Sequence, residues 1–204
     1  MHNLYFETKR ALQEGLGVPA DKDEWIKDAK DAALRLLATD GISEAQALAA
    51  WSDVDEEFFL RERADDVATF TKAIIANEDD DAPVLLLRDV GGEFPVATQI
   101  FVHAKDRQNI FSIISATLDK LHLNIQDARL HTTHDNLAFD VFYVLNEQGQ
   151  PVGDNAQLCT TILETLRSGI LDPSAVSFDV HRRTTRQLKN FTLKTVASLR
   201  NDVE

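Results

Sequence analysis

The most regular pattern of apolar and polar positions lies in residues 97–132. Side chains alternate with a period of two along residues 99–104, as expected for a strand. One side carries Gln99, Phe101 and His103, and the other carries Ile100, Val102 and Ala104. Apolar positions then recur at helical spacing from Ile110 to Leu121, and Leu123-Asn124-Ile125 begins another extended stretch. This pattern predicts a strand, a tight loop, a helix and a second strand, in that order.

The loop of this unit is the first candidate for binding. Asp106 is expected to cap the helix, because its carboxylate can accept hydrogen bonds from N–H groups two or three residues later. The backbone N–H groups of residues 107–110 then point out of the loop at a helix N-terminus. Such a place favours a carboxylate or another anion.

The second half of the chain continues the alternation of strands and helices. Residues 137–145 predict a strand, the apolar spacing from Leu158 to Leu166 predicts a helix, and residues 175–180 predict a closing strand. The order β-α-β-β-α-β predicts an α+β fold of the ferredoxin-like kind. Helices cover one face of such a sheet, so we expect its other face to be open and the sheet to pair with a second domain or a second copy.

The first part of the chain predicts helices. Acidic residues at positions 21, 23 and 24 suit the first turn of one helix, Ser43 with Gln46 has the form of a capping box, and Asp65-Asp66 opens a longer helix. A shorter helix is expected at residues 56–60. The stripes expected to be buried comprise Trp25, Ala29, Ala32, Ala33, Leu36 and Leu37 in the first helix, and Ala47, Leu48 and Trp51 in the second.

An acidic run at residues 77–81 separates the two parts. It lacks the glycine and the distal glutamate of a calcium loop, so we interpret it as a linker. The predicted organisation is a helical linker region at residues 1–81 and a ferredoxin-like domain at residues 82–182. Residues 183–204 are predicted to be a basic link and the start of a truncated further domain.

Charge and composition exclude several classes of partner. The net charge of −13 argues against nucleic acid, whose phosphates require Lys and Arg contacts, although residues 181–204 are basic. No apolar run approaches the length of a membrane span, and we expect no secretory leader. The single cysteine, Cys159, excludes an intrachain disulfide and favours a cytoplasmic location.

Catalytic and metal-binding motifs are not found in the sequence. One cysteine cannot form a zinc cluster, and the histidines do not form HExxH. His131 and His134 are three residues apart, but we interpret them as an exposed loop pair. The sequence also has no G-x-S-x-G elbow, no phosphate-binding loop lysine and no paired aspartates of a nucleotidyltransferase. We therefore expect no catalytic residues and no metal site.

Longer stretches resemble a known family. Residues 104–132 resemble the first half of an ACT domain, the small amino-acid-sensing module whose usual loop reads D-R-P-G-L. Their sequence is AKDRQNIFSIISATLDKLHLNIQDARLHT. Two later stretches resemble the regulatory end of the bifunctional uridylyltransferase/uridylyl-removing enzyme, which modifies the nitrogen-regulatory protein PII. They are NLAFDVFYVLNEQGQPV and HRRTTRQLKNFTLKT. Two earlier stretches resemble the linker that precedes the ACT domains in that enzyme. They are LYFETKRALQEGL and EEFFLRERADDVATFTKAI.

This resemblance implies a regulatory role without catalysis. The two catalytic domains, and the magnesium that they require, would lie outside these residues, so whether the protein is an enzyme depends on a parent chain. These residues would hold the first ACT domain and no cofactor. Glutamine would be the sensed signal, and PII would be a partner through the parent enzyme.

The resemblance also implies a set of ligand-binding residues. A glutamine carboxylate would lie on the backbone N–H groups of Gln108, Asn109 and Ile110, with Asp106 fixing the loop or meeting the ammonium group. The side-chain amide would be read by two further residues on the next strand or on its neighbour in a paired domain. These two residues are Asn124 and Gln126.

Two functions remain open. Gln108-Asn109 stands where ACT domains commonly have Pro-Gly, and Asn109 brings a side chain to a position where glycine would leave room for a ligand. The domain is therefore either a glutamine sensor or a ligand-free module that docks another ACT domain.

Overall fold

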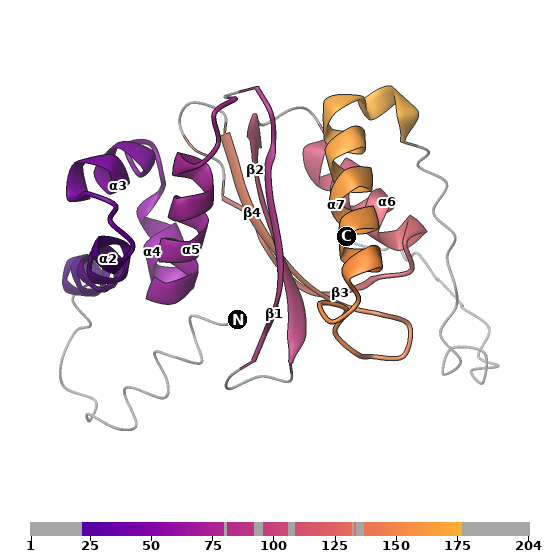
Figure 1. Ribbon diagram of the computed structural model, residues 1–204, viewed down its shortest axis with the longest axis horizontal. Helices are drawn as coiled ribbons and strands as arrows, with labels where there is room; N and C mark the ends of the chain where they lie inside the picture. The colour runs from indigo at the N-terminus through magenta and orange to yellow at the C-terminus, as the bar shows by residue number, and fades with distance from the viewer. Residues whose placement is uncertain are drawn as a thin grey trace, which may run out of the picture.

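The computed structural model describes residues 22–79, 81–91, 96–105, 109–131, 133 and 137–176. Four helices come first, and a sheet with two further α-helices follows (Figure 1). The helices are α2 (Lys22–Thr39), α3 (Glu44–Ala50), α4 (Glu56–Arg61), α5 (Ala64–Ile75), α6 (Ile110–Lys120), α7 (Ala156–Leu171) and the 3-10 helix η1 (Pro173–Ala175). The strands are β1 (Val84–Val90), β2 (Ala97–Lys105), β3 (Asn124–Arg129) and β4 (Leu137–Leu145).

The strands form one antiparallel sheet in the order β1-β2-β4-β3. The helices α6 and α7 lie on one face of this sheet, and α2 to α5 lie on the other (Figure 1). This arrangement confirms the predicted fold class, α+β with an N-terminal helical segment followed by a ferredoxin-like unit. Of the β-α-β-β-α-β order, the elements from β2 to α7 lie within the described residues.

Both faces of the sheet are buried, in contrast to the expected open face. Phe58 and Phe70 of the helical segment join Phe101, Phe139 and Val141 of the sheet in one apolar core. The rings of Phe70 and Phe101 stack with centroids 4.1 Å apart. The expectation was wrong because it considered only the two helices within the ferredoxin-like unit, whereas α4 and α5 also bury apolar residues against the sheet.

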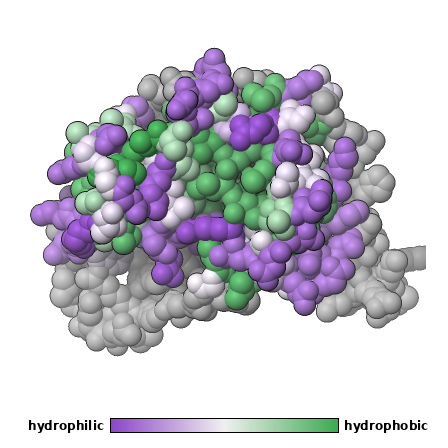
Figure 2. Space-filling model, in the orientation of Figure 1, coloured by the Kyte–Doolittle hydropathy of each residue, from purple (hydrophilic) through white to green (hydrophobic). Residues whose placement is uncertain are grey.

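The strand beside β2 is β1, which precedes it in the chain. The two strands pair from Val84 with His103 to Val90 with Ala97. In a ferredoxin-like order this edge position belongs to the closing strand, which the sequence predicts at residues 175–180. Here Pro173–Ala175 forms η1, and residues 177–180 lie outside the described residues. Apolar side chains gather over β1 in the middle of the face seen in Figure 2, between the helical segment and α7.

The predicted helix signals in the first part of the chain are largely confirmed. Ser43 and Gln46 form the expected capping box, and Asp55 caps α4 by accepting a hydrogen bond from the backbone of Glu57. The predicted stripe of α2 is wrong in part, because its buried residues are Ile26, Ala33 and Leu37. Leu36 and Leu48, both expected to be buried, are 42% and 47% exposed.

The predicted boundary between residues 81 and 82 falls in a short connection from α5 to β1. The side-chain amide of Asn77 donates to the carbonyl oxygens of Asp79, at 2.6 Å, and Ala82, at 3.4 Å. These bonds give the connection a turn of its own, and the division into domains stays a prediction. Among the described helices, none combines the length and the apolar character that crossing a bilayer would require.

Candidate functional site

The predicted binding loop ends at Asn109, which is the N-cap residue of α6. Its backbone is left-handed, with φ 73° and ψ 16°, and its side chain makes no capping hydrogen bond. The helix therefore begins at Ile110, and the prediction that Asp106 is its N-cap is wrong. Asp106 and Gln108, two of the predicted ligand-binding residues, lie outside the described residues.

Ile110 can meet a ligand only through its backbone. Its side chain is buried in the core between the sheet, α6 and α7. The first helical hydrogen bond runs from the N–H of Ile113 to the carbonyl oxygen of Asn109, over 2.9 Å. Ile110, where the described part of the chain resumes with α6, is thus anchored in the core beside the predicted carboxylate site.

Asn124 and Gln126 lie at the opposite end of the sheet from this loop. In the pairing of β2 with β4, Lys105 is opposite Leu137 at the end near the loop. Asn124 is opposite Leu145 at the other end of β4. The helix α6 separates the two places, and its 11 residues span about 16 Å at 1.5 Å per residue.

Asn124 and Gln126 make local hydrogen bonds in this position. The amide of Asn124 donates to the carbonyl oxygen of Asn146 over 3.2 Å, and that of Gln126 donates to the carbonyl oxygen of Asn124 over 3.3 Å. The pairing of β3 with β4 shifts register between Ile125 and Asp127, so Gln126 lies in a bulge. One chain therefore does not bring these two amides to the loop at Asn109.

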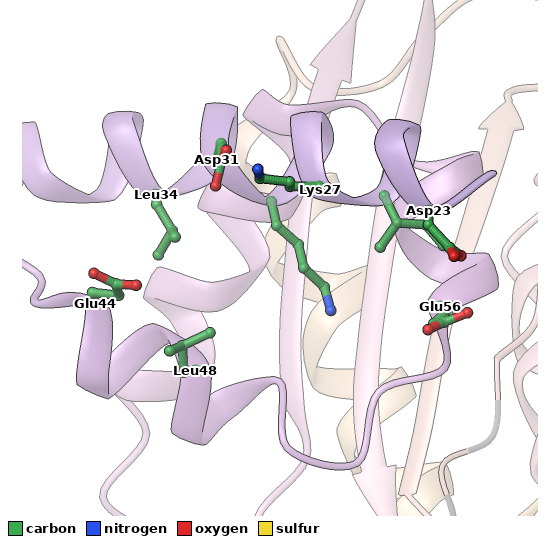
Figure 3. Close-up of a pocket in the computed structure, with 9 residues that line it drawn as sticks. Asp23, Lys27, Asp31, Leu34, Glu44, Leu48 and Glu56 are labelled. Carbon is green, nitrogen blue, oxygen red and sulfur yellow. The ribbon is translucent and has the colours of Figure 1, made fainter. Parts of the chain in front are cut away.

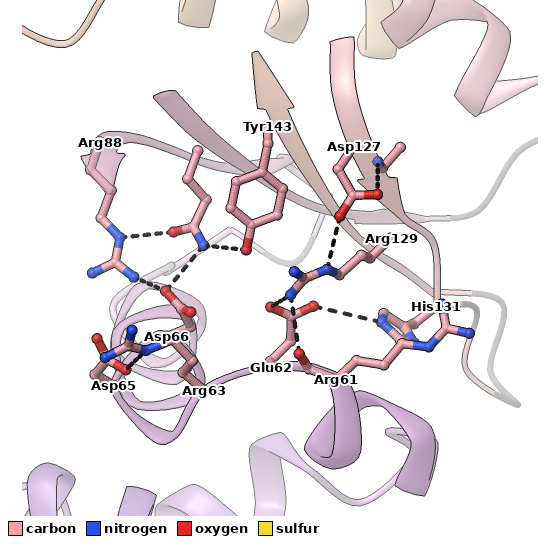
Figure 4. A network of polar contacts seen from close by, with 12 residues as sticks. Arg61, Glu62, Arg63, Asp65, Asp66, Arg88, Asp127, Arg129, His131 and Tyr143 are labelled. Atoms are coloured by element: carbon pink, nitrogen blue, oxygen red, sulfur yellow. Dashed lines mark hydrogen bonds and ion pairs between the residues drawn. The ribbon is translucent and has the colours of Figure 1, made fainter. Parts of the chain in front are cut away.

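A row of polar side chains crosses the sheet face that the helical segment covers (Figure 4). Arg88 and Asp66 form an ion pair, and Gln99 accepts from Arg88 over 2.8 Å while donating to Asp66 over 3.0 Å. The amide of Gln99 also donates to the hydroxyl oxygen of Tyr143 over 3.1 Å. The guanidinium of Arg129 lies 4.8 Å from the centroid of the Tyr143 ring. Each of the four strands thus contributes one residue to the row.

The row ends in a buried ion pair between Arg129 and Glu62, the residue that follows α4. Nη1 of Arg129 donates to Oε2 of Glu62 over 3.0 Å and to the carbonyl oxygen of Arg61 over 3.1 Å. The Glu62 side chain is fully buried, and that of Arg129 is 11% exposed. Burial raises the pKa of Glu62 to about 7, although the charge of Arg129 acts to lower it.

His131 lies beside this pair and is buried, so the prediction that it belongs to an exposed loop is wrong. Its Nε2 is 4.0 Å from Oε1 of Glu62, and its ring meets Phe58 edge to face with centroids 5.4 Å apart. Burial, reinforced by the charge of Arg61, lowers the pKa of His131 to about 4. Oε1 of Glu62 and Nε2 of His131 are both buried without a hydrogen-bond partner among the described atoms.

The sequence interpretation missed this row because polar residues on a sheet normally face water. A signal was available, since Gln99 shares its side of β2 with Phe101, and Arg129 and Tyr143 alternate with apolar positions. A polar residue that interrupts an otherwise apolar side of a strand indicates a buried polar contact.

Two cavities lie outside this row. One of about 300 Å³ opens on the helical segment between charged side chains of both signs (Figure 3), and it is lined by Asp23, Ile26, Lys27, Lys30, Asp31, Leu34, Glu44, Leu48 and Glu56. The other, of about 230 Å³, contains His103 and Lys105 near the predicted loop. Of the predicted ligand-binding residues that the structure describes, Asn109, Ile110, Asn124 and Gln126, none lines either cavity. In the parts of the chain that the structure describes, no three His, Cys, Asp or Glu side chains gather as a metal ion would require.

Comparisons with known proteins agree with the resemblance noted in the sequence. Residues 21–73 match the family model described as "Uridylyltransferase GlnD fifth domain". The bifunctional uridylyltransferase/uridylyl-removing enzyme of Pseudomonas aeruginosa is 36% identical over 203 residues, which cover 99% of this chain and 23% of that enzyme. The corresponding enzyme of Pseudomonas fluorescens Pf-5 is 35% identical over 205 residues, covering 100% of this chain and 23% of the enzyme.

No solved structure matches the chain. The chain spans about a quarter of the length of the curated relatives that it matches. It is therefore related, over its whole length, to one region of the bifunctional uridylyltransferase/uridylyl-removing enzymes.

Proposed function

We propose that this chain is a regulatory, non-catalytic region of a bifunctional uridylyltransferase/uridylyl-removing enzyme, and that its ACT domain senses glutamine. The observation that carries the proposal is the similarity of the whole chain to one quarter of such enzymes. Uridylyl transfer and removal, the magnesium for that chemistry and the contact with PII belong to the parent enzyme, which acts in the cytoplasm. Purified residues 1–204 should therefore transfer no uridylyl group to PII.

The carboxylate of glutamine is assigned to the N-terminus of α6. The proposed donors are the backbone N–H groups of Gln108, Asn109 and Ile110. The helix begins at Ile110, and the positive end of its dipole favours an anion there. The left-handed backbone of Asn109 supports the proposal, because glycine commonly takes this place in ACT domains and asparagine is among the few residues that tolerate the same conformation. Asp106 fixes the loop or meets the ammonium group.

The side-chain amide of glutamine is assigned to a second copy of the chain. Asn124 and Gln126 are too far from Asn109 within one chain, but β3 lies at the edge of the sheet. If two β3 strands pair antiparallel about a two-fold axis, the beginning of one lies beside the end of the other. This pairing brings Asn124 of one copy toward the end of the sheet where Asn109 of the other lies.

A ligand-free pairing module is the alternative. Ile125 on β3 and Phe111 on α6 are 36% and 43% exposed, so the edge of the domain presents apolar side chains to a neighbour. The amides of Asn124 and Gln126 already make hydrogen bonds within the chain. In this alternative the domain docks another ACT domain, and glutamine binds elsewhere in the parent enzyme.

Calorimetry with millimolar glutamine distinguishes the two functions. The wild-type chain should give binding heat, glutamate should give less because its side chain lacks the amide, and Asn109→Trp should give none because the indole fills the loop. Asn109→Gly is the matched control, since glycine accepts the same backbone conformation and should keep binding. Folded wild-type protein that gives no heat would favour the pairing module.

Mixing two variants tests whether the site is shared between copies. Asn109→Trp and Asn124→Ala should each abolish binding alone. After mixing and re-equilibration, half of the dimers contain one of each, and one of their two sites is intact. Binding should therefore return to about a quarter of the wild-type sites. No recovery in a mixture that forms dimers, or a monomeric mass at high concentration, would contradict a shared site.

A further inference from the structure

The edge strand β3 is attached to the helical segment by a charged side chain. Among the described strands, β3 pairs only with β4, and its register is interrupted by the bulge after Ile125. Arg129, at the end of β3, reaches across the sheet face to Glu62 and to the carbonyl oxygen of Arg61. Arg61 ends α4, and Glu62 lies between α4 and α5. The contact joins residues 67 positions apart in the chain.

Separating these two side chains is unfavourable because both are buried. An isolated buried carboxylate or guanidinium loses its hydration without a compensating partner. Arg129 is also held from the strand side, where its Nε donates to Asp127 over 3.3 Å and its guanidinium lies over the Tyr143 ring. A displacement of β3 that carries Arg129 with it therefore either moves Glu62 as well or breaks the ion pair.

The connection between α4 and α5 is short and consists of Glu62 and Arg63. Glu62 has extended backbone angles, with φ −95° and ψ 149°, and Arg63, the N-cap of α5, makes no side-chain capping bond. The next acidic residue, Asp66, is bound to Arg88 and Gln99 of the first two strands. Glu62 and Asp66 thus attach one short segment, residues 62–66, to opposite edges of the sheet.

We propose that the Glu62–Arg129 ion pair transmits displacement of β3 to the connection between α4 and α5. β3 is the edge at which a second domain or copy would pair, so the helical segment responds to events at that edge. The coupling itself does not depend on glutamine. Its use as a response to glutamine rests on the proposed function.

Hydrogen exchange of the whole chain without ligand tests the coupling. In Glu62→Gln, Arg129 loses its charged partner on the helical segment, and the amides of residues 124–128 should exchange at least tenfold faster than in the wild type. Amides of β2 should change only as much as the global stability does. Glu57→Gln is the matched control, because Glu57 forms an exposed ion pair with Arg61 on α4, at 2.5 Å. Equal exchange at residues 124–128 in both variants would overturn the proposal.

A second arm adds 10 mM glutamine and separates the coupling from the proposed function. In the wild type, protection should increase at residues 109–128 and also at residues 58–67, and in Glu62→Gln it should increase only at the first segment. Protection of residues 58–67 that persists in Glu62→Gln would overturn the proposed link. If glutamine protects nothing in the wild type, glutamine sensing fails, and the ligand-free comparison alone decides on the link.

Discussion

Asn109 has a backbone conformation that most side chains with a Cβ avoid. Its φ of 73° lies in the left-handed region, where asparagine is tolerated better than other residues and glycine best of all. This residue also explains why α6 begins later than the sequence predicted. The carboxylate of Asp106 matched the usual capping pattern, whereas a left-handed residue leaves no such pattern in the local sequence.

Substitution at Asn109 should change stability according to this conformation. Asn109→Ala should lower the free energy of unfolding by about 1 kcal/mol, because alanine is strained at positive φ. Asn109→Gly should have little effect or a small stabilising one. Urea unfolding of both variants beside the wild type measures the difference. Equal midpoints for the alanine and glycine variants would contradict the left-handed assignment.

Glu62 and His131 have pKa values displaced in opposite directions. The pKa of Glu62 is raised from 4.5 to about 7, so its contribution to stability is present below pH 4.5 and is lost as pH rises through 7. The pKa of His131 is lowered from 6.5 to about 4, so its contribution is present above pH 6.5 and is lost as pH falls through 4. Between pH 4.5 and 6.5 the two dependences oppose each other.

The difference between each variant and the wild type should therefore show the titration of the group that was removed. Relative to the wild type, Glu62→Gln should lose stability as pH falls from 7 to 4.5, and His131→Phe should lose stability as pH rises from 4 to 6.5. Each pKa unit corresponds to about 1.4 kcal/mol. Urea unfolding at intervals of half a pH unit, expressed as the difference from the wild type, measures both slopes. Slopes of the same sign would show that the two groups do not titrate in this way.

At the scale of elements, the loop before α7 is attached to β1 and β2 by a compact set of hydrogen bonds. Oδ1 of Asp89 accepts from the hydroxyl of Thr98 over 2.6 Å and from the backbone of Gly153 over 2.9 Å. The hydroxyl oxygen of Thr98 in turn accepts from the backbone of Val152 over 2.7 Å. A Cβ at position 153 would overlap the Asp89 carboxylate, so the close approach requires glycine.

Gly153→Ala should destabilise the protein by about 1–3 kcal/mol through this overlap. Asp89→Ala removes the obstacle together with its hydrogen bonds. The double variant should therefore be more stable than the sum of the two single losses predicts. Thermal or urea unfolding of the four proteins gives the coupling. Strict additivity would mean that the added methyl group is accommodated without contact with Asp89.

The sequence was informative about elements and less so about how they face one another. Strong periodicity located β2, α6, β4 and α7, and the capping box at Ser43 was confirmed. The buried stripe of α2 was misplaced, because alanine and leucine recur on more than one side of that helix and only its packing against α4 and α5 selects Ile26.

At the scale of the whole molecule, the helical segment supplies the second layer over the sheet. Local patterns do not contain this information, because the contact between Phe70 and Phe101 joins residues far apart in the chain. Because local patterns do not contain long-range contacts, the polar row was also missed, and Asn124 was expected beside the loop at Asn109. Side-chain types predicted a strand, but the direction of β3 relative to α6 depends on the assembled sheet.

Residues 82–176 expressed alone should not behave as the whole chain does. Removing α2 to α5 exposes Phe101, Phe139 and Val141, which are buried against them. The shortened protein should self-associate and bind a hydrophobic dye, whereas the full chain should bind little. Sedimentation and dye fluorescence of the two proteins provide the comparison. A monomeric, dye-free short protein would support residues 82–176 as an independent domain.

The position of β1 also bears on how fast the sheet can form. β1 ends at Val90 and β2 begins at Ala97, so this edge of the sheet closes as a hairpin between neighbouring segments. A closing strand after α7 would instead have to reach β2 across the whole of α6, β3, β4 and α7. Contacts between near neighbours in sequence shorten the search for the native topology. The β1–β2 edge should therefore be among the first parts of the sheet to gain protection during refolding, before β3 docks on β4.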